Sequence, residues 1–446
     1  MKKRNLIEGD IKKQVLLFTL PLAFSGILQQ LFNAADVAVV GQFVGKEAMA
    51  AVGANSPVVN ILITLFTGVS LGANVVISQL TGQQDHQNSE KAVHTAVLVA
   101  LISGLIVLVF GQLAAQGILT MMKVPADVMD LAVLYLRVYL IGMPVIMLYN
   151  FEAAIYQSQG DTRTPLIALV ASGLVNVVLN VFFVVVIGRS VDGVAIATVI
   201  SNVISSLILL VNLVRGKLPV RVYRSGLKIE PVLLKRMLRI GLPAGIQGMV
   251  FSISNIIIQT AVNSLGTDVV AGSSAAFNIE VIGFFLVDSF SQACTTFVGQ
   301  NYGAGKQKRC HDSIKWCLIE SSIIAAIASV VLIASGRFIL SFFNKDPGVI
   351  AYGMMRLTGI LPFEVLNGAI DILSGAMRGY GESMKPAIVT LVGVCGVRIT
   401  WVYTYFQAHR TFDVVLMAYP ISWVVTFIIL VILYISMRKN GLGEMK

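Results

Sequence analysis

The chain has 446 residues, of which 56% are hydrophobic and 13% charged, and its mean hydropathy is +0.82. This composition is far more apolar than that of an average soluble domain and predicts an all-α polytopic membrane protein in a lipid bilayer. The net charge of +10 does not indicate a nucleic-acid partner, because the basic residues lie in short connections between apolar runs.

Apolar runs of about 20 residues or more cross the ~30 Å of hydrocarbon in a bilayer. The start of the chain shows no signal-peptide pattern, so the first run is expected to be retained. Interior prolines at positions 21, 57, 144, 243 and 362 predict kinks rather than helix ends. The twelve runs, each read as a transmembrane helix, are 14–40, 48–80, 92–121, 128–157, 165–187, 193–213, 234–263, 270–298, 314–335, 349–377, 386–406 and 414–437.

Lysine and arginine residues are distributed unequally between the two sides that these helices define. With the amino terminus inside, 24 basic residues fall on the cytoplasmic side and 6 outside, leaving Arg137, Arg356 and Arg398 within helices, of 33 in total. Because positively charged loops stay in the cytoplasm, both termini are predicted to be cytoplasmic.

The sequence also contains an internal repeat with an offset of 218–222 residues. Thr19-Leu20-Pro21 with Gly26 matches Gly241-Leu242-Pro243 with Gly248, and the connections repeat at the same offset. A repeat of six helices enters the membrane the same way twice, which is the parallel type found in some transporters. We therefore predict two six-helix bundles, residues 1–214 and 234–446, joined by a basic cytoplasmic linker at 215–233.

Asp36 is a carboxylate inside an apolar run, about five residues or ~7 Å from the outer end of its helix. Asn176 and Asn180 share one helix face, and they and Thr198 are expected at the same depth as Asp36. These oxygens suit either a proton on Asp36 or a Na⁺ ion. The alternatives are that the amides and hydroxyl only join helices, or that Asp36 caps a helix end.

Several short motifs together resemble the multidrug and toxic compound extrusion (MATE) family, in its DinF-like branch. The resemblance covers essentially the whole chain and implies a V-shaped fold of twelve helices that exports organic, often cationic compounds against a cation. It also implies a cation-coupling site at Asp36, Asn176, Asn180 and Thr198. The motifs are Asn33-Ala34-Ala35-Asp36 with Gly41, the loop Gln79-Leu80-Thr81-Gly82, Gln159-Gly160-Asp161-Thr162-Arg163-Thr164-Pro165, Asn176-Val177-Val178-Leu179-Asn180, Gly193-Val194-Ala195-Ile196-Ala197-Thr198 and, in the second half, the loop Arg378-Gly379-Tyr380-Gly381-Glu382.

The chain departs from the family pattern at three positions. Asn180 stands where some DinF-like members have a second carboxylate, and Phe251 and Asn367 stand where acids are expected in the NorM-like branch. Coupling through the second bundle is therefore not expected in the NorM manner. The charged residues of that bundle are secondary candidates, with Glu364 and Arg398 expected to pair; the set is Glu280, Asp288, Glu364, Asp371 and Arg398.

No motif supports an enzyme, a cofactor or a structural metal site. The nearest sequence to a nucleotide-binding loop, Gly303-Ala304-Gly305-Lys306, is followed by glutamine, and the four cysteines form no Cys-x-x-Cys pair. An ion gradient, H⁺ or Na⁺, is therefore the expected driving force. We predict a monomeric multidrug antiporter in the plasma (inner) membrane of a prokaryote; a lipid-linked precursor flippase of the same superfamily is the alternative, and a membrane-embedded transferase a more remote one.

Overall fold

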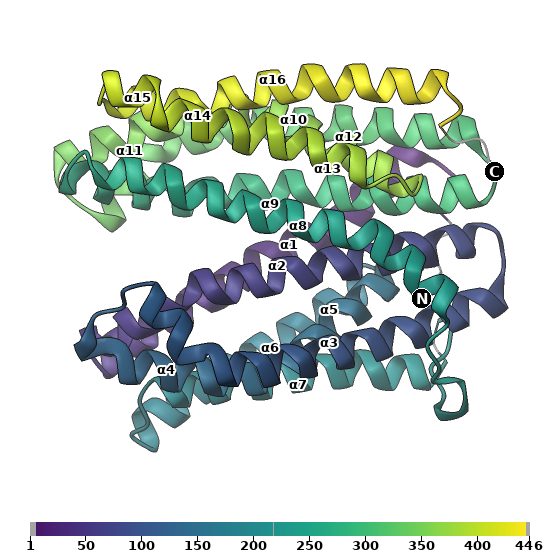
Figure 1. Ribbon diagram of the computed structural model, residues 1–446, viewed down its shortest axis with the longest axis horizontal. Helices are drawn as coiled ribbons and strands as arrows, with labels where there is room; N and C mark the ends of the chain where they lie inside the picture. Colours follow the sequence, from purple (N-terminus) through teal and green to yellow (C-terminus); the bar gives the residue numbers. More distant parts are fainter. Residues whose placement is uncertain (1–5, 217, 443–446) are drawn as a thin grey trace. The chain divides into compact units, whose positions relative to one another are not determined.

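The computed structural model describes residues 6–216 and 218–442, and every regular element in that part of the chain is a helix (Figure 1). Five residues of the predicted cytoplasmic basic set lie outside the described residues: Lys2, Lys3, Arg4, Lys217 and Lys446.

The first half forms α1 (Ile11–Phe43), α2 (Lys46–Gly82), α3 (His86–Met121), α4 (Ala126–Ile141), α5 (Met143–Ser158), α6 (Arg163–Val181), the π-helical turn η1 (Phe182–Val186) and α7 (Val191–Val214). The connection that follows contains a short 3-10 turn, η2 (Arg224–Gly226). The second half forms α8 (Pro231–Asn263), α9 (Thr267–Gly303), α10 (Gln307–Phe343), α11 (Pro347–Ile360), the 3-10 turn η3 (Leu361–Phe363), α12 (Glu364–Gly379), α13 (Met384–Thr390), the π-helical turn η4 (Leu391–Gly396), α14 (Val397–Tyr403), α15 (Tyr405–Ala408) and α16 (Phe412–Lys439).

In the described residues, 11 helical stretches are long and apolar enough to cross a membrane, and the bent pair α4 and α5 makes up to 12. The prediction of a polytopic protein with twelve transmembrane helices is therefore confirmed. Two of the five interior prolines lie at breaks: the chain bends by 50° between α4 and α5, beside Pro144, and Pro362 lies in the 3-10 turn η3. Pro21, Pro57 and Pro243 lie inside continuous helices, as predicted, and kinks at these three positions stay a prediction.

Two segments predicted to be loops are helical, wholly or in part. Residues 79–82 form the last turn of α2, and Arg378 and Gly379 end α12. Apolar length marks where the chain leaves the hydrocarbon, but a helix continues beyond that point as long as its backbone stays hydrogen-bonded. Consequently Arg378 also lies inside a helix, in addition to the three arginines assigned there from the sequence.

The chain divides into two compact units. Of the described residues, unit 1 contains 24–245 and unit 2 contains 6–23 with 246–442. The first turns of α1 thus belong to unit 2, where Phe18 packs edge-on against Phe297 with ring centroids 5.5 Å apart. Likewise the first turns of α8 belong to unit 1, where Met237 and Ile240 are buried in its core. The units differ from the predicted bundles because the first turns of α1 and of α8 belong to the opposite units. The boundaries of the sequence repeat itself stay a prediction.

Glycine contacts allow α8 to enter unit 1. A Cβ atom on Gly68 of α2 would lie 2.2 Å from the backbone nitrogen of Gly245, and one on Gly72 would lie 2.2 Å from the carbonyl oxygen of Met237. Any side chain at these positions would force the two backbones apart. Small residues at such crossings are the usual way for membrane helices to pack closely.

The connection between α7 and α8 is fixed to unit 1 rather than free. Val220 and Val222 are buried in the unit 1 core. The ring nitrogen Nε2 of His94 on α3 accepts a hydrogen bond from the Tyr223 backbone N–H at 3.2 Å, and the Thr95 hydroxyl accepts one from the Glu230 N–H at 3.1 Å. The described residues of the predicted linker are therefore an ordered part of unit 1.

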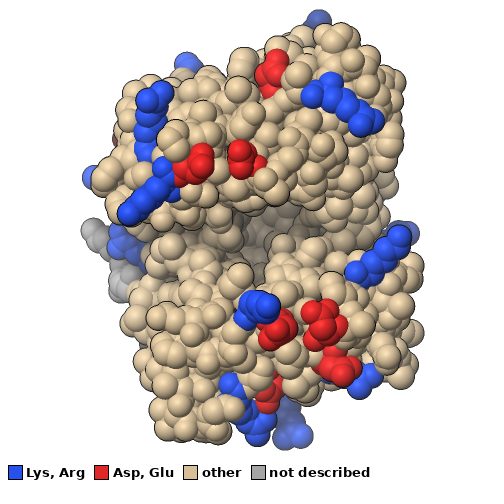
Figure 2. All heavy atoms as spheres, turned by 90° about the vertical axis from the view of Figure 1, so that its left-hand side faces the viewer, with Lys and Arg blue, Asp and Glu red and all other residues tan. Residues whose placement is uncertain are grey.

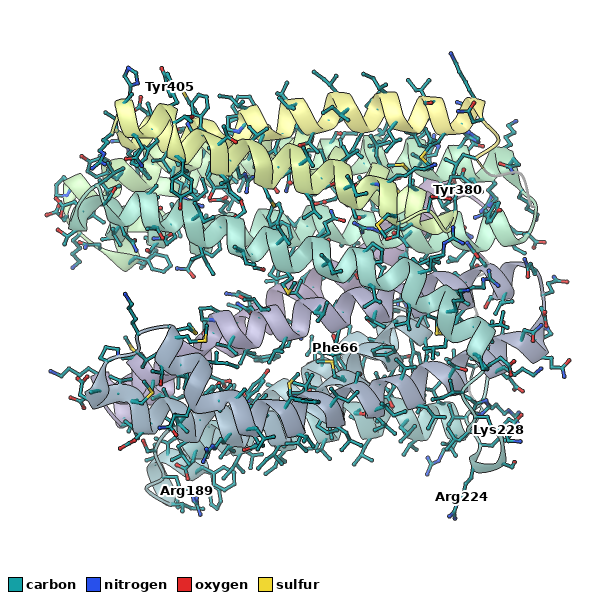
Figure 3. All side chains as sticks on the ribbon, in the orientation of Figure 1. Phe66, Arg189, Arg224, Lys228, Tyr380 and Tyr405 are labelled. Atoms are coloured by element: carbon teal, nitrogen blue, oxygen red, sulfur yellow. The ribbon has the colours of Figure 1, made fainter. Side chains whose placement is uncertain are left out.

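The basic residues predicted for opposite sides lie at opposite ends of unit 1. Figure 3 shows Arg189 at one end of this unit and Arg224 and Lys228 at the other. Figure 2 shows acidic and basic side chains intermixed, rather than gathered by sign, on the face of each unit that it presents. The separation of Arg189 from Arg224 and Lys228 is the one that the predicted transmembrane direction requires, and the side that faces the cytoplasm stays a prediction.

Candidate functional site

Asp36 lies in α1, seven residues before the helix ends at Phe43, and its side chain is buried with 6% exposure. One carboxylate oxygen, Oδ1, accepts a hydrogen bond from Asn180 Nδ2 at 2.5 Å, and Oδ2 accepts one from the Thr198 hydroxyl at 3.2 Å. Asn180 Nδ2 also donates to Asn176 Oδ1 at 3.2 Å, and Asn176 Nδ2 donates to Thr198 Oγ1 at 3.5 Å. The structure therefore brings all four candidate residues together; we call these four side chains the Asp36 cluster.

The local sequence places these side chains. Asn176 and Asn180 are four residues apart on α6, so they project from the same face. One turn before Asn176, a Cβ atom on Gly173 would lie only 1.9 Å from the Phe32 ring. The glycine therefore lets α1 lie directly on α6, and Asp36, one turn after Phe32, reaches the amides.

The electrostatics of the cluster are unusual for a membrane interior. In the part of the chain that the structure describes, Asp36 accepts hydrogen bonds from neutral groups, and no salt bridge involves it. Asn180 Oδ1 is buried and has no hydrogen-bond partner among the described residues. A carboxylate without a counter-ion beside an unused amide oxygen is a donor set suited to a proton or a small hard cation.

Two tyrosines extend this site. Tyr135 and Tyr139 on α4 are buried and stacked, with ring centroids 6.0 Å apart, and both are near enough to Asp36 to interact electrostatically. The sequence analysis assigned neither tyrosine to this site. Because the two tyrosines are four residues apart on one helix, they share a face, and this spacing could have identified them as a pair.

In unit 2 the secondary candidates have other partners than expected. Arg356, 3% exposed, donates from Nε to Glu280 Oε2 at 2.8 Å and from Nη1 to the Ser273 hydroxyl at 3.0 Å. The expected pairing of Glu364 with Arg398 is wrong, because no salt bridge joins them in the described residues. The lateral position of a helix, which decides such pairing, is not visible in the sequence.

Arg398 is enclosed by aromatic rings and neutral donors and acceptors. It donates from Nε to the Ser422 hydroxyl at 3.1 Å and from Nη1 to Asn255 Oδ1 at 3.2 Å. Its guanidinium carbon lies 4.3 Å from the Tyr419 ring centroid and 5.2 Å from that of Phe251, the position where the NorM-like branch would have an acid. Cation–π contacts therefore stand where an ion pair was expected.

The remaining acids of unit 2 are held by amides. Glu364 accepts from Asn367 Nδ2 at 2.9 Å, and Asp288 accepts from Gln292 Nε2 at 2.7 Å. Asp371 and Asp288 both interact electrostatically with Arg378, so these acids also share a cation. The secondary candidates belong to unit 2, whereas the Asp36 cluster belongs to unit 1.

Sequence reasoning overlooked one buried acid altogether. Glu152 on α5 has no exposed surface; its Oε2 accepts a hydrogen bond from the Ser206 hydroxyl at 2.8 Å, and its Oε1 has no partner among the described residues. The signal was the same as for Asp36, a single carboxylate within an apolar run.

Comparison with known proteins places this arrangement in a family. The MatE family model matches residues 21–182 and 243–404, two stretches offset by 222 residues, as the internal repeat predicts. Among curated proteins, the probable multidrug resistance protein YoeA of Bacillus subtilis is 26% identical over 94% of this chain and 93% of its own length. The probable multidrug resistance protein NorM of Thermotoga maritima is 26% identical over 89% and 87%, and the multidrug export protein MepA of Staphylococcus aureus is 20% identical over 86% and 85%.

Solved structures share the fold over the full chain. An outward-facing multidrug resistance MATE family transporter of the MOP superfamily has a TM-score of 0.92 at 24% identity, covering 100% of both chains. A MOP superfamily transporter from Pyrococcus furiosus has a TM-score of 0.91 at 24% identity, with the same coverage. With both repeats matched by the family model, the chain is a multi-pass membrane protein that belongs to the MatE (multidrug and toxic compound extrusion) family.

Proposed function

We propose that this protein is a secondary active multidrug efflux transporter that exports organic, often cationic compounds in exchange for H⁺ or Na⁺. The observation that carries this proposal is the Asp36 cluster, a buried carboxylate surrounded by neutral oxygen and nitrogen groups with one amide oxygen, Asn180 Oδ1, unused. Family membership and the names of the relatives support the drug-export part of the proposal.

The cluster suits cation exchange for a physical reason. A charged carboxylate in a membrane helix costs at least about 2.5–3.5 kcal/mol on insertion scales, and that cost is reduced by binding a cation or a proton. Bound Na⁺ would be held by oxygens of Asp36, Thr198, Asn176 and Asn180; a bound proton would neutralise Asp36 and leave its hydrogen bonds to Thr198 and Asn180 in place. Release of the cation on one side and rebinding on the other is the exchange that alternating access requires.

The rest of the proposal concerns the setting of this exchange. We propose a monomer in a prokaryotic plasma membrane with both termini cytoplasmic, which acts on drugs and carries out no enzymatic reaction. The lipid-linked precursor flippase is less well supported, because a pyrophosphate needs free arginines. Arg356 is already engaged by Glu280, and the long side chain of Arg137 is exposed on α4.

Everted membrane vesicles test the proposal. Uptake of a fluorescent organic cation is measured with the proton gradient and the sodium gradient collapsed separately. We expect uptake to stop when one of the two gradients is removed and to persist when the other is removed. Uptake that survives loss of both gradients, or that requires ATP, would contradict ion-coupled export.

A further inference from the structure

Glu152 is a second buried acid of unit 1 that the proposed mechanism has not used. It lies in α5 six residues before the helix ends at Ser158, which is about 9 Å at 1.5 Å per residue. A fully buried carboxylate oxygen without a hydrogen-bond partner is unfavourable, and more so if the group is charged. A proton on Glu152 would remove that charge.

Among the described residues, no cationic side chain forms a salt bridge with Glu152. The phenol groups of Tyr149 and Tyr156 lie nearest on its own helix, and Tyr156 donates its hydroxyl to the Leu209 carbonyl at 3.0 Å. In the described residues, no salt bridge reaches Glu152 from any of the helices packed on α5. The titratable and charged groups of those helices are Lys46 and Glu47 of α2, His86, Glu90, Lys91 and His94 of α3, Asp127, Asp130, Tyr135, Arg137 and Tyr139 of α4, Arg163 of α6 and Asp192 of α7.

A polar face of α7 connects Glu152 with Asp36. Thr198, Asn202 and Ser206 are spaced by four residues and therefore project from the same side of the helix. Thr198 donates to Asp36 at one end of this face, and Ser206 donates to Glu152 at the other. Between them, Asn202 donates to the Thr198 carbonyl at 2.9 Å. The eight residues from Thr198 to Ser206 separate the two carboxyl groups by about 12 Å along the helix.

We propose that Glu152 is the inner proton-holding residue of unit 1 and exchanges a proton with Asp36 along this face of α7. In the exchange the protonated Asp36 becomes a carboxylate as the Glu152 carboxylate becomes an acid, so charge and protons balance. The hydroxyls of Thr198 and Ser206 suit this transfer because each is both a donor and an acceptor. The inference rests on the proposed function, with H⁺ as the coupling ion.

The test compares Glu152→Gln with Glu320→Gln. The first substitution keeps the shape of the side chain and its hydrogen-bond acceptor for Ser206. Glu320 is the matched control, because one of its carboxylate oxygens is also buried without a partner among the described residues, but it lies on α10 in unit 2. Two measurements are made on each purified variant: the infrared carbonyl band of protonated carboxyl groups as a function of pH, and, in proteoliposomes, efflux driven by a pH gradient against gradient-free exchange of the same drug.

We expect Glu152→Gln to lose one protonated-carboxyl component and most pH-driven efflux while it retains gradient-free exchange, and Glu320→Gln to transport normally. Asp36→Asn should shift the pH at which the Glu152 component titrates, which a purely structural Glu152 would not show. The proposal is overturned if Glu152→Gln keeps the wild-type pH profile of efflux, or if the infrared component is unchanged. If the wild type exports the drug only with a sodium gradient, the proposed function holds with Na⁺ and this inference fails. If neither gradient drives efflux, the proposed function fails, and the infrared titration with Asp36→Asn still decides whether the two carboxyl groups share a proton.

Discussion

The two units repeat one fold but treat buried charge differently. In unit 1, Asp36 and Glu152 are buried among neutral partners: two amides and a hydroxyl for the first, one serine for the second. In unit 2, Arg356 and Arg398 are buried with 3% and 1% exposure, and Arg356 forms a salt bridge with Glu280. In unit 1 these two buried acids are thus left without a cation, whereas unit 2 holds two buried arginines, one of which pairs with an acid.

This difference indicates a division of roles. A buried ion pair contributes little net stability, but removal of either partner leaves an isolated charge, so such a pair holds one arrangement. A buried acid without a cationic partner gains stability by binding a proton or cation from solution. Whether the acid is occupied therefore depends on the pH or on the cation concentration. We expect cation exchange in unit 1 and a fixed electrostatic framework in unit 2.

The largest effect should follow Asp36→Asn. The substitution preserves the shape of the side chain but removes the exchangeable charge, so gradient-driven drug efflux should fall to the level of empty vesicles while folding and drug binding persist. Transport in everted vesicles and the thermal unfolding temperature in detergent measure the two properties. Asp288→Asn in unit 2 is the control and should transport normally. Wild-type transport by Asp36→Asn would contradict the assignment of cation exchange to unit 1. Glu280, Asp288 and Glu364 of unit 2 would then become the candidates for cation coupling.

A large loss of stability should follow Arg356→Met. The substitution leaves Glu280 buried without its partner, which costs about 3–5 kcal/mol in comparable ion pairs. Chemical unfolding in detergent measures this loss. A second variant, Arg356→Met with Glu280→Leu, should recover most of it because no isolated charge remains. If the single variant were as stable as the wild type, the pair would not be the framework that the comparison assigns to unit 2.

A change of ion preference, without loss of transport, is expected from Asn180→Asp. The new carboxylate replaces the amide that donates to Asp36 at 2.5 Å, so two acids would adjoin and repel unless a cation lies between them. Efflux should therefore depend more strongly on Na⁺, as measured by its sodium concentration dependence. Asn255→Asp in unit 2 is the control, because its new charge would pair with Arg398. Equal sodium dependence in both variants would contradict the role of the Asp36 cluster.

The sequence was sufficient to predict properties that depend on distance along a helix. Asp36, Asn180 and Thr198 could be placed at one depth because each residue adds 1.5 Å, and the structure brings these side chains into contact. The twelve spans followed from apolar length in the same way. Glu152 showed the same sequence pattern as Asp36, a single carboxylate within an apolar run. Its partner Ser206 lies on another helix, and one serine in an apolar run does not by itself indicate a site.

Properties that depend on lateral packing could not be predicted. Arg398 was assigned to Glu364 from depth alone, whereas the arrangement of the helices places it against Tyr419 and Ser422. The break between α4 and α5 and the exchange of the first turns of α1 and α8 also depend on neighbours far away in sequence. One sequence without aligned relatives contains no direct record of such contacts.

The smallest predicted effect concerns the connections that precede α3 and α10, which are equivalent in the repeat. Asp85 caps α3: its Oδ1 accepts the Asn88 backbone N–H at 3.0 Å and its Oδ2 accepts Asn88 Nδ2 at 2.7 Å. At the matching position Lys306 provides no side-chain cap to α10, and its Nζ donates to the Ile7 carbonyl at 2.9 Å instead. Asp85→Ala should therefore cost about 0.5–2 kcal/mol of stability.

The pH dependence of this contribution has a definite sign. The hydrogen bonds from Asn88 favour the charged carboxylate and lower the pKa of Asp85 below its ordinary value. A lowered pKa in the folded state means that the stabilisation is complete above the ordinary aspartate pKa and disappears as the pH falls through the lowered one. The difference in unfolding free energy between wild type and Asp85→Ala, measured in detergent, should therefore shrink on acidification. Lys306→Ala should show no such trend. A difference that stays constant with pH would mean that the cap does not act through the charge of Asp85, and the two connections would then be electrostatically equivalent.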